Sequence, residues 1–342
     1  MDWNLVLRTS FEAAFGVDAV IYCLAAIGIN LQFGYTGLLN FGQVGFMAVG
    51  AYSVGISVNY YHWPWWIGIL IGLALSVVLA LLLGVPTLRL RADYLAIVTI
   101  ATGEIIRLIM RAAVLADFSG GSAGLPGDYR RPFFDLSPFD PTGEFPRNNL
   151  IGWLPRTLWL DWSGQDFWVM IVGWSLVGIV SFAMWQLIRS PWGRVLRAIR
   201  EDEEAVRALG KNVYWYKMQS LMIGGGIGCL AGFMFAYAKG SVQPDNYSTA
   251  VTFFAYTALI LGGTAKIKGP IVGAMILWFV IAFSNQVLRG AKAEGWISDN
   301  LMDGTQVGQV RFMIVGLGLM LLLIFRPQGI FGDKKELALD AR

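Results

Sequence analysis

Charged side chains are scarce in this chain of 342 residues, where they make up 14% of the sequence. A soluble domain carries about a quarter of its residues as charged ones. Hydrophobic residues make up 56%, and the mean hydropathy is +0.57. The formal net charge of +3 is too small to indicate nucleic-acid binding. The composition therefore predicts an integral membrane protein.

Histidine occurs once and cysteine twice, which excludes several kinds of site. His62 has no second histidine, cysteine or acid beside it, so neither a metal site nor a Ser-His-Asp arrangement is expected. Cys23 and Cys229 lie inside apolar runs, which argues against a disulfide framework. The sequence also lacks the G-x-x-x-x-G-K-[ST] phosphate loop. We expect no catalytic residue, no metal and no cofactor in this chain.

Long apolar runs are abundant, and each span of a bilayer needs roughly 20 apolar residues. The runs predict an all-α, polytopic helical bundle of about nine spans. Two of them are weak, because 40–59 is rich in glycine and 251–265 is short, so either could be broken or re-entrant. The nine expected spans are 14–33, 40–59, 64–84, 92–113, 166–188, 217–239, 251–265, 269–289 and 309–325.

Lysine and arginine gather in three connections between spans and after the last span, and all four places fall on one side when nine spans alternate. Basic residues favour the cytoplasmic side. We therefore expect the N-terminus outside, the C-terminus in the cytoplasm, a single permease domain over 1–330 with an outer loop at 114–165, and a cytoplasmic tail at 331–342. The basic residues are Arg89, Arg91, Arg189, Arg194, Arg197, Arg200, Arg207, Lys211, Lys217, Lys266, Lys268, Arg326, Lys334 and Lys335.

The stretch 190–212, "SPWGRVLRAIREDEEAVRALGKN", is the most extended charged segment between spans. Ser190 and Pro191 form a helix start, and the acids at 201–204 favour a second helix start. We expect Val206 and Leu209 to form the apolar face of that second helix, and Gly210 is typical of a helix end. The segment therefore predicts two short helices that form a docking surface for a partner; the alternative is a solvated charged loop.

Three charged residues share one face of the expected fourth span, namely Glu104, Arg107 and Arg111. A charge at the middle of a bilayer costs roughly 2.5–3.5 kcal/mol, so we expect these side chains to be paired or to face the bundle interior. Two interpretations stay open: an ion pair that locks this helix to a neighbour, or a polar patch on a translocation path.

The stretch 34–52, "GYTGLLNFGQVGFMAVGAY", combines glycines with amide side chains beside apolar runs. Glycine lets helix backbones approach closely, and it also permits a helix break that lines a cavity. A weak echo occurs at 261–276, "LGGTAKIKGPIVGAMI". We therefore expect these two stretches near a translocation route, with Asn40, Gly42, Gln43, Gly263 and Gly269 beside Glu104 and Arg107.

Several motifs resemble one family of transporters. The run "EAVRALG" at 204–210 resembles the E-A-A-x-x-x-G motif of ABC importer permeases, with Val206 in place of the second alanine and no Ile-x-Leu-Pro after it. The wider run 190–210 is similar to the branched-chain amino acid permeases of the LivM type. So are "GYTGLLNFGQVGFMAVGAY", "DYLAIVTIATGEIIRLI" (93–109), "LILGGTAKIKGPIVGA" (259–274) and "FRPQGIFG" (325–332). The resemblance covers roughly 20–330, although the loop at 128–165 is longer than the family leads us to expect.

This resemblance implies a permease subunit of an ATP-driven importer in the bacterial cytoplasmic (inner) membrane, with branched-chain amino acids as cargo. Urea, other amino acids or amides stay open, and an ion-coupled secondary transporter is a further alternative. The implied partners are a second permease of the LivH type, two ATPase subunits of the LivG and LivF type that bind ATP and magnesium, an extracytoplasmic amino-acid-binding protein and membrane lipid, but no nucleic acid. The residues implied to couple to the ATPases are Arg194, Arg197, Arg200, Glu201, Glu204, Ala205 and Gly210.

Overall fold

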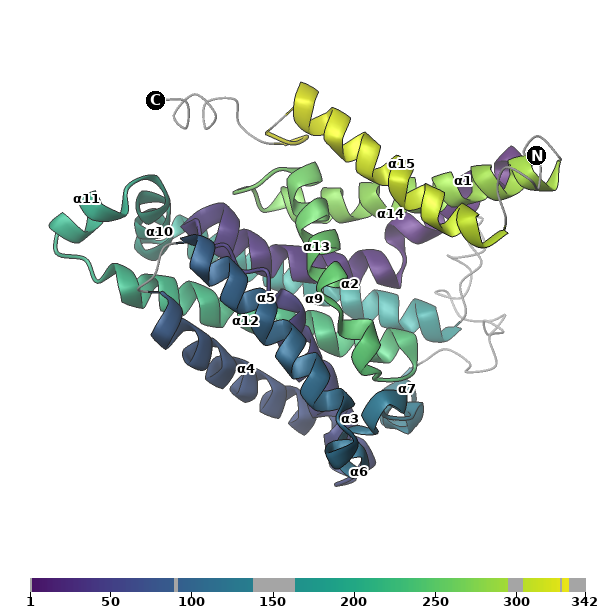
Figure 1. Ribbon diagram of the computed structural model, residues 1–342, viewed down its shortest axis with the longest axis horizontal. Coiled ribbons are helices and arrows are strands. Elements are labelled where there is room, and N and C mark those ends of the chain that lie inside the picture. The colour runs from purple at the N-terminus through teal and green to yellow at the C-terminus, as the bar shows by residue number, and fades with distance from the viewer. Residues whose placement is uncertain (1, 89–91, 138–163, 295–303, 327, 332–342) are drawn as a thin grey trace.

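The computed structural model describes residues 2–88, 92–137, 164–294, 304–326 and 328–331, and these are almost entirely helical (Figure 1). They contain no β-strand, only an isolated bridge between Leu125 and Val242. The α-helices are α1 (Trp3–Phe15), α2 (Val17–Ile29), α3 (Gln43–Asn59), α4 (Trp65–Thr87), α5 (Ala92–Arg111), α6 (Ala116–Ser119), α7 (Arg131–Phe134), α9 (Gly164–Arg189), α10 (Pro191–Glu201), α11 (Glu203–Ala208), α12 (Val213–Lys239), α13 (Thr249–Gly262), α14 (Lys268–Ala293) and α15 (Gly304–Phe325). A π-helix, η1 (Asn30–Tyr35), continues α2, and short 3-10 turns are η2 (Ala113–Leu115), η3 (Gly121–Ala123), η4 (Gly127–Arg130) and η5 (Pro244–Tyr247).

Each of the nine expected spans falls on a helix, but the first helix of the chain was not predicted. Helix α1 precedes the expected first span, and the Asp2 carboxylate caps it by accepting from the Asn4 and Leu5 amides. Within the described ranges, five helical segments are long and apolar enough to cross a membrane. Helices α3 and α13, with 17 and 14 residues, are about 25 Å and 21 Å long, which is less than a bilayer core. The count of nine spans stays a prediction.

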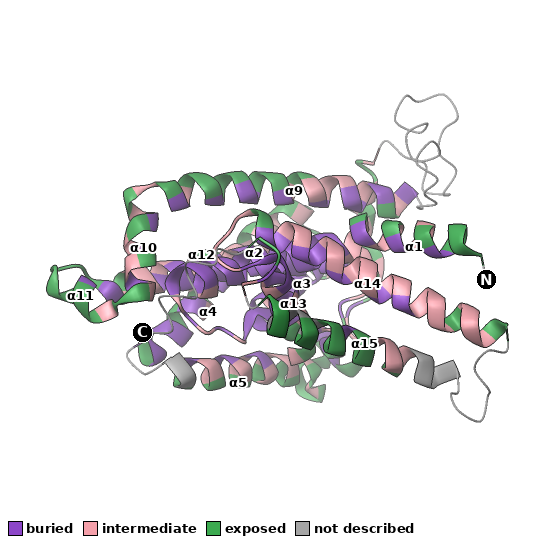
Figure 2. Ribbon diagram, turned by 90° about the horizontal axis from the view of Figure 1, so that it is seen from above, coloured by how far each residue is buried: buried purple, intermediate pink, exposed green. Residues whose placement is uncertain are grey.

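The centre of the bundle is formed by α2, α3 and α12, which are buried along most of their length (Figure 2). Glycine permits this packing. A Cβ on Gly232 of α12 would lie 1.9 Å from the Met47 carbonyl oxygen, and one on Gly50 of α3 would lie 2.1 Å from that of Cys229. No side chain fits in either space, so the α3 and α12 backbones touch directly.

The remaining long helices surround this centre and turn apolar side chains outward. Helix α4 exposes Leu70, Leu75 and Leu82, and α9 exposes Ile179 and Phe182. Helices α5 and α9 lie on opposite sides of the bundle, with their exposed faces outward (Figure 2). An apolar outer surface of this kind is suited to contact with lipid tails or with another membrane subunit.

The two expected polar segments lie at opposite ends of the bundle (Figure 1). Helices α10 and α11 project at one end. At the other, the described part of the expected outer loop 114–165 forms short helices, and the bridge between Leu125 and Val242 joins it to the end of α12. The rest of that loop, with Trp153, Trp159 and Trp162, lies outside the described residues, as do 332–342 of the expected tail.

Candidate functional site

Helices α10 and α11 form the two-helix projection that the sequence predicts for 190–212. Pro191 begins α10, and the Asp202 carboxylate caps α11 by accepting from the Ala205 amide at 2.9 Å. The side chain of Glu203 pairs with Arg207 at 2.8 Å and with Lys217 of α12, which ties α11 to the bundle. The charged segment is therefore an ordered structure and not a solvated loop.

Most residues assigned to coupling lie on the outer surface of this projection. Leu209, which we expected on the apolar face with Val206, is instead 81% exposed, because it lies beyond the last turn of α11 while Val206 packs inward. Gly210 follows with a positive φ of 77°, a conformation that favours glycine. The other exposed members of the set are Arg194, Arg197, Glu201, Glu204 and Ala205.

Arg200 differs from these residues because it points toward the bundle. Its Nη1 atom donates to the Gly34 carbonyl oxygen of η1 at 2.6 Å. The guanidinium of Arg197 lies 5.7 Å from the ring centroid of Tyr35 in the same π-helix. The projection is therefore joined directly to an element of the interior.

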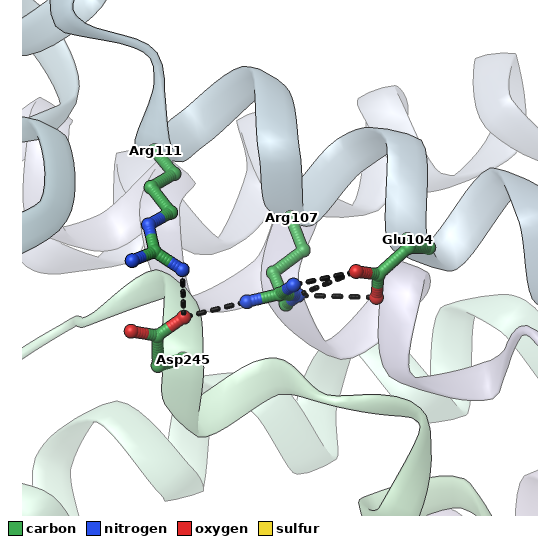
Figure 3. Close-up of polar contacts among 4 residues, drawn as sticks. All are labelled: Glu104, Arg107, Arg111 and Asp245. Atoms are coloured by element: carbon green, nitrogen blue, oxygen red, sulfur yellow. Dashed lines mark hydrogen bonds and ion pairs between the residues drawn. The ribbon is translucent and has the colours of Figure 1, made fainter.

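The charged face of α5 forms a cluster with an acid from η5 (Figure 3). The Arg107 guanidinium lies 2.5 Å from Glu104 Oε1 and 2.5 Å from Asp245 Oδ1, and Arg111 lies 3.3 Å from Asp245 Oδ1. The side chain of Arg107 is 17% exposed, that of Glu104 39% and that of Asp245 54%. Arg107 thus locks α5 to η5, while both carboxylates remain accessible on the surface of the subunit.

Sequence reasoning missed Asp245, which stands 138 residues after Arg107. The ion pair to a neighbouring element, one of the two interpretations left open by the sequence, is formed with this short turn. A signal for it was present, since an isolated acid between two apolar segments needs a basic partner if it lies near the membrane.

A second polar region is fully buried around η1, in the first glycine-rich stretch. The Asn40 side-chain amide donates to Gln32 Oε1 at 2.8 Å and to Gln43 Oε1 at 3.3 Å, and Asn40 Oδ1 accepts from the Gly42 amide at 2.9 Å. Gln43 donates in turn to the Gly224 carbonyl oxygen of α12 at 3.0 Å. Buried amides need partners of this kind. Here they hold the non-helical segment before α3 against α12.

Gly42 and the glycines of α12 shape this region. A Cβ on Gly42 would lie 2.3 Å from the Thr99 carbonyl oxygen of α5. On α12, Gly224 and Gly228 leave room for the side chains of Gln32 and Gln43, each of whose Nε2 atoms would clash with an added Cβ. The spacing of four between Gly224, Gly228 and Gly232 is the signal that could have identified this face from the sequence.

The second glycine-rich stretch is the turn between α13 and α14. Gly263 has a φ of 109°. A Cβ on Gly269 would lie 2.1 Å from the Gly263 carbonyl oxygen. The chain after α15 reaches this turn, because the Ile330 and Phe331 amides donate to the Leu261 and Gly262 carbonyl oxygens at 3.1 Å each. The motif "FRPQGIFG" therefore supplies hydrogen bonds to the end of α13.

Asn30 connects the two glycine-rich stretches. Its side chain donates to the Lys266 carbonyl oxygen at 2.9 Å and accepts from the Ala265 amide at 2.9 Å. Thr36, at the other end of η1, shares a hydrogen bond of 2.8 Å with Ser220 of α12. The π-helix thus contacts α10, α12 and the α13–α14 turn. Among the described residues no group of three His, Cys, Asp or Glu side chains could hold a metal ion.

Comparisons with known proteins match this chain to transport permeases. The family model described as "branched-chain amino acid transport system / permease component" matches residues 13–324. The chain is 30% identical to the high-affinity branched-chain amino acid transport system permease protein LivM of Salmonella typhimurium, over 95% of this chain and 71% of that protein. The chain is also 30% identical to LivM of Escherichia coli, over 91% of this chain and 68% of that protein. The nucleoside ABC transporter permease protein NupC of Lactococcus lactis is 24% identical, over 85% of this chain and 86% of that protein.

Proposed function

Because the chain belongs to the family of branched-chain amino acid transport system permease components, which are transport subunits and not enzymes, we propose that it is the permease subunit of an ABC importer for leucine, isoleucine and valine. It works by alternating access in the bacterial cytoplasmic membrane. A second permease, of the LivH type, completes the pore, and two ATPases of the LivG and LivF type bind ATP and magnesium. An external binding protein delivers the cargo.

The projecting α11, joined to the interior through α10, is the observation that carries this proposal. Glu204, Ala205, Leu209 and Gly210 form an exposed surface at the tip, which suits contact with an ATPase. Movement of this surface is passed through Arg200 to the Gly34 carbonyl oxygen of η1. From η1 it reaches α12 and the α13–α14 turn, so closure of the ATPases reorients the centre of the bundle.

The cluster on α5 and η5 supports a place for the cargo route. The carboxylates of Glu104 and Asp245 are 39% and 54% exposed, and contact between lipid and a charged side chain costs free energy. In this proposal the second permease therefore covers this face, and the cargo route passes beside it. A free amino acid carries both an ammonium and a carboxylate, which Glu104 and Arg107 complement. In this proposal Asn40, Gly42, Gln43, Gly263 and Gly269 form the packed, moving wall behind the route.

The membrane orientation follows the basic residues. The α10 end lies in the cytoplasm with the C-terminal tail, and the end with η2, α6 and α7 lies outside with the N-terminus. Residues 1–330 act as a single permease domain.

Charge reversal at α11 tests the ATPase contact. The chain is co-expressed with its second permease and ATPases, and the amount of ATPase that co-purifies is measured. We expect Glu204→Lys to weaken the association by at least about tenfold, because it places a like charge or an unpaired charge in the contact. Asp128→Lys is the matched control, since Asp128 is an exposed acid in η4 at the opposite end.

Unchanged co-purification with Glu204→Lys would contradict the assignment of α11. Cargo is tested separately in proteoliposomes with the binding protein, where leucine should stimulate ATP hydrolysis and urea or a nucleoside should not. Uptake by the chain alone under an ion gradient would instead support a secondary transporter.

A further inference from the structure

A cavity of about 560 Å³ lies where α9, α10, η1 and the α13–α14 turn meet. Among the described residues, four cationic side chains line it, against the single carboxylate of Glu201. The aromatic rings of Trp185 and Tyr35 also line it. The cationic residues are Arg189, Arg197, Arg200 and Lys266. A cavity with this excess of positive charge favours binding of an anion. Its volume is far larger than the volume of one phosphate ion.

Two of the cations face aromatic rings and not carboxylates. The Arg189 guanidinium lies 4.0 Å from the ring centroid of Trp185, and that of Arg197 lies 5.7 Å from that of Tyr35. Among the described residues no carboxylate forms an ion pair with either arginine. Ring contacts leave the donors at the edge of a guanidinium available, so both arginines can bind an oxyanion.

An apolar stripe on α9 leads directly to this cavity. Ile179, Phe182 and Trp185 are 66%, 59% and 39% exposed. The rings of Phe182 and Trp185 stack with centroids 5.8 Å apart, and Trp185 in turn carries Arg189. Helix α9 lies at the edge of the bundle with its exposed face outward, and α10 turns away at its end (Figure 2). Apolar surface followed by an aromatic ring and then arginine is the order met on passing from the acyl chains of a bilayer to its headgroups.

We propose that this cavity binds the phosphate-bearing headgroup of an anionic phospholipid, whose acyl chain lies along Ile179 and Phe182 of α9. Arg189 and Arg197 contact the phosphate, while Lys266 adds positive charge. The lipid belongs to the leaflet that borders the α10 end, whichever side of the membrane that is. Bound between α9, α10 and the α13–α14 turn, it holds the base of the projection against the bundle.

Native mass spectrometry of the full chain tests this site. The chain is released from nanodiscs that contain equal amounts of phosphatidylglycerol and phosphatidylcholine with the same acyl chains. We expect the wild-type chain to retain phosphatidylglycerol selectively, and Arg189→Gln combined with Arg197→Gln to retain at least about tenfold less. Arg194→Gln combined with Lys211→Gln removes the same charge outside the cavity and should retain the wild-type amount.

A conservative double variant guards against a folding defect. Arg189→Lys combined with Arg197→Lys keeps both charges and should restore most of the retention. Equal retention by the glutamine variant and the wild type, or equal retention of phosphatidylcholine, would overturn the proposal. So would thermal stabilisation by inorganic phosphate that matches the effect of the lipid, since that result indicates a free-anion site. The measurement reads lipid binding and not transport, so its failure would leave the proposed function intact.

Discussion

Single amide side chains determine how the non-helical segments are held inside this bundle. Asn30, Gln32, Asn40 and Gln43 are each at most 2% exposed, and each forms hydrogen bonds to remote backbone or to another amide. Leaving a buried donor or acceptor unpaired costs about 1–3 kcal/mol. These contacts therefore fix one arrangement of the segment before α3 and of the α13–α14 turn.

Charged residues on α5 act differently because they remain partly exposed. Arg107 has two carboxylate partners, so the loss of one leaves it paired with the other. The lock between α5 and η5 depends on Asp245, and Glu104 is available for a further contact. The structural role and the proposed cargo-binding role can therefore be tested separately at Glu104.

Glu104→Gln should reduce uptake of leucine while it leaves stability nearly unchanged. The pair with Arg107 is partly exposed, so its loss costs at most about 1 kcal/mol. A charge-assisted hydrogen bond to the cargo ammonium is worth more, and we expect uptake to fall by about tenfold. Uptake into proteoliposomes and the melting temperature measure the two effects.

Glu12→Gln is the matched control, because Glu12 pairs with Arg8 at 3.1 Å on α1, away from the proposed route. Wild-type uptake with Glu104→Gln, or a large drop in melting temperature, would favour the purely structural role.

At the scale of elements, α12 is the central helix against which α2, α3 and α4 pack. Its glycine face admits the backbone of α3 and the amide side chains of Gln32 and Gln43, whereas its other sides meet α4 and α9. Close backbone packing of this kind has no spare volume, so an added methyl group must displace a whole helix.

Gly232→Ala tests this packing. The new Cβ would meet the Met47 carbonyl oxygen at 1.9 Å and the Met47 Cα at 2.5 Å. We expect a loss of roughly 1–3 kcal/mol in the free energy of unfolding, because α3 must move away from α12. Thermal unfolding of the purified chain in detergent measures this loss as a lower melting temperature.

Gly226→Ala, in the same helix, provides the comparison. Its nearest neighbours would be Leu73 Cδ2 at 3.8 Å and Ser76 Oγ at 4.0 Å, which is ordinary contact. If both variants melted at the same temperature, the α3–α12 contact would not be as tight as the structure indicates.

Across the whole molecule, the two ends have different chemistry. One end carries the charged α10–α11 projection, and the other carries the short helices around η2 and α6 (Figure 1). The distribution of lysine and arginine predicts that the first end lies in the cytoplasm. Native cysteines permit a direct test, because Cys23 and Cys229 are both buried.

Single cysteines introduced at the two ends should label from opposite sides. Val114 is 93% exposed in η2 and Leu209 is 81% exposed beside α11. We expect a membrane-impermeant maleimide to label Val114→Cys in right-side-out vesicles and Leu209→Cys in inside-out vesicles. The unmodified chain is the control for background. Labelling of both positions from one side would contradict the proposed orientation.

The sequence by itself determined where the long helices lie and which family the chain belongs to. The apolar runs predicted nine spans, and each of these falls on a helix, because a chain in lipid must satisfy its backbone hydrogen bonds within each segment. Proline at 191 and the acids at 201–204 likewise predicted α10 and α11, since helix starts depend on local residues. The short α1 escaped prediction because it precedes the first long apolar run.

Only the tertiary structure decided what each polar residue touches. Asp245 meets Arg107 across 138 positions, and Asn30 reaches Ala265 across 235. Whether Leu209 faced inward or outward likewise depended on where α11 ends against its neighbours. Local sequence specifies a helix through nearby hydrogen bonds and periodicity, whereas contacts between helices depend on how their surfaces fit together.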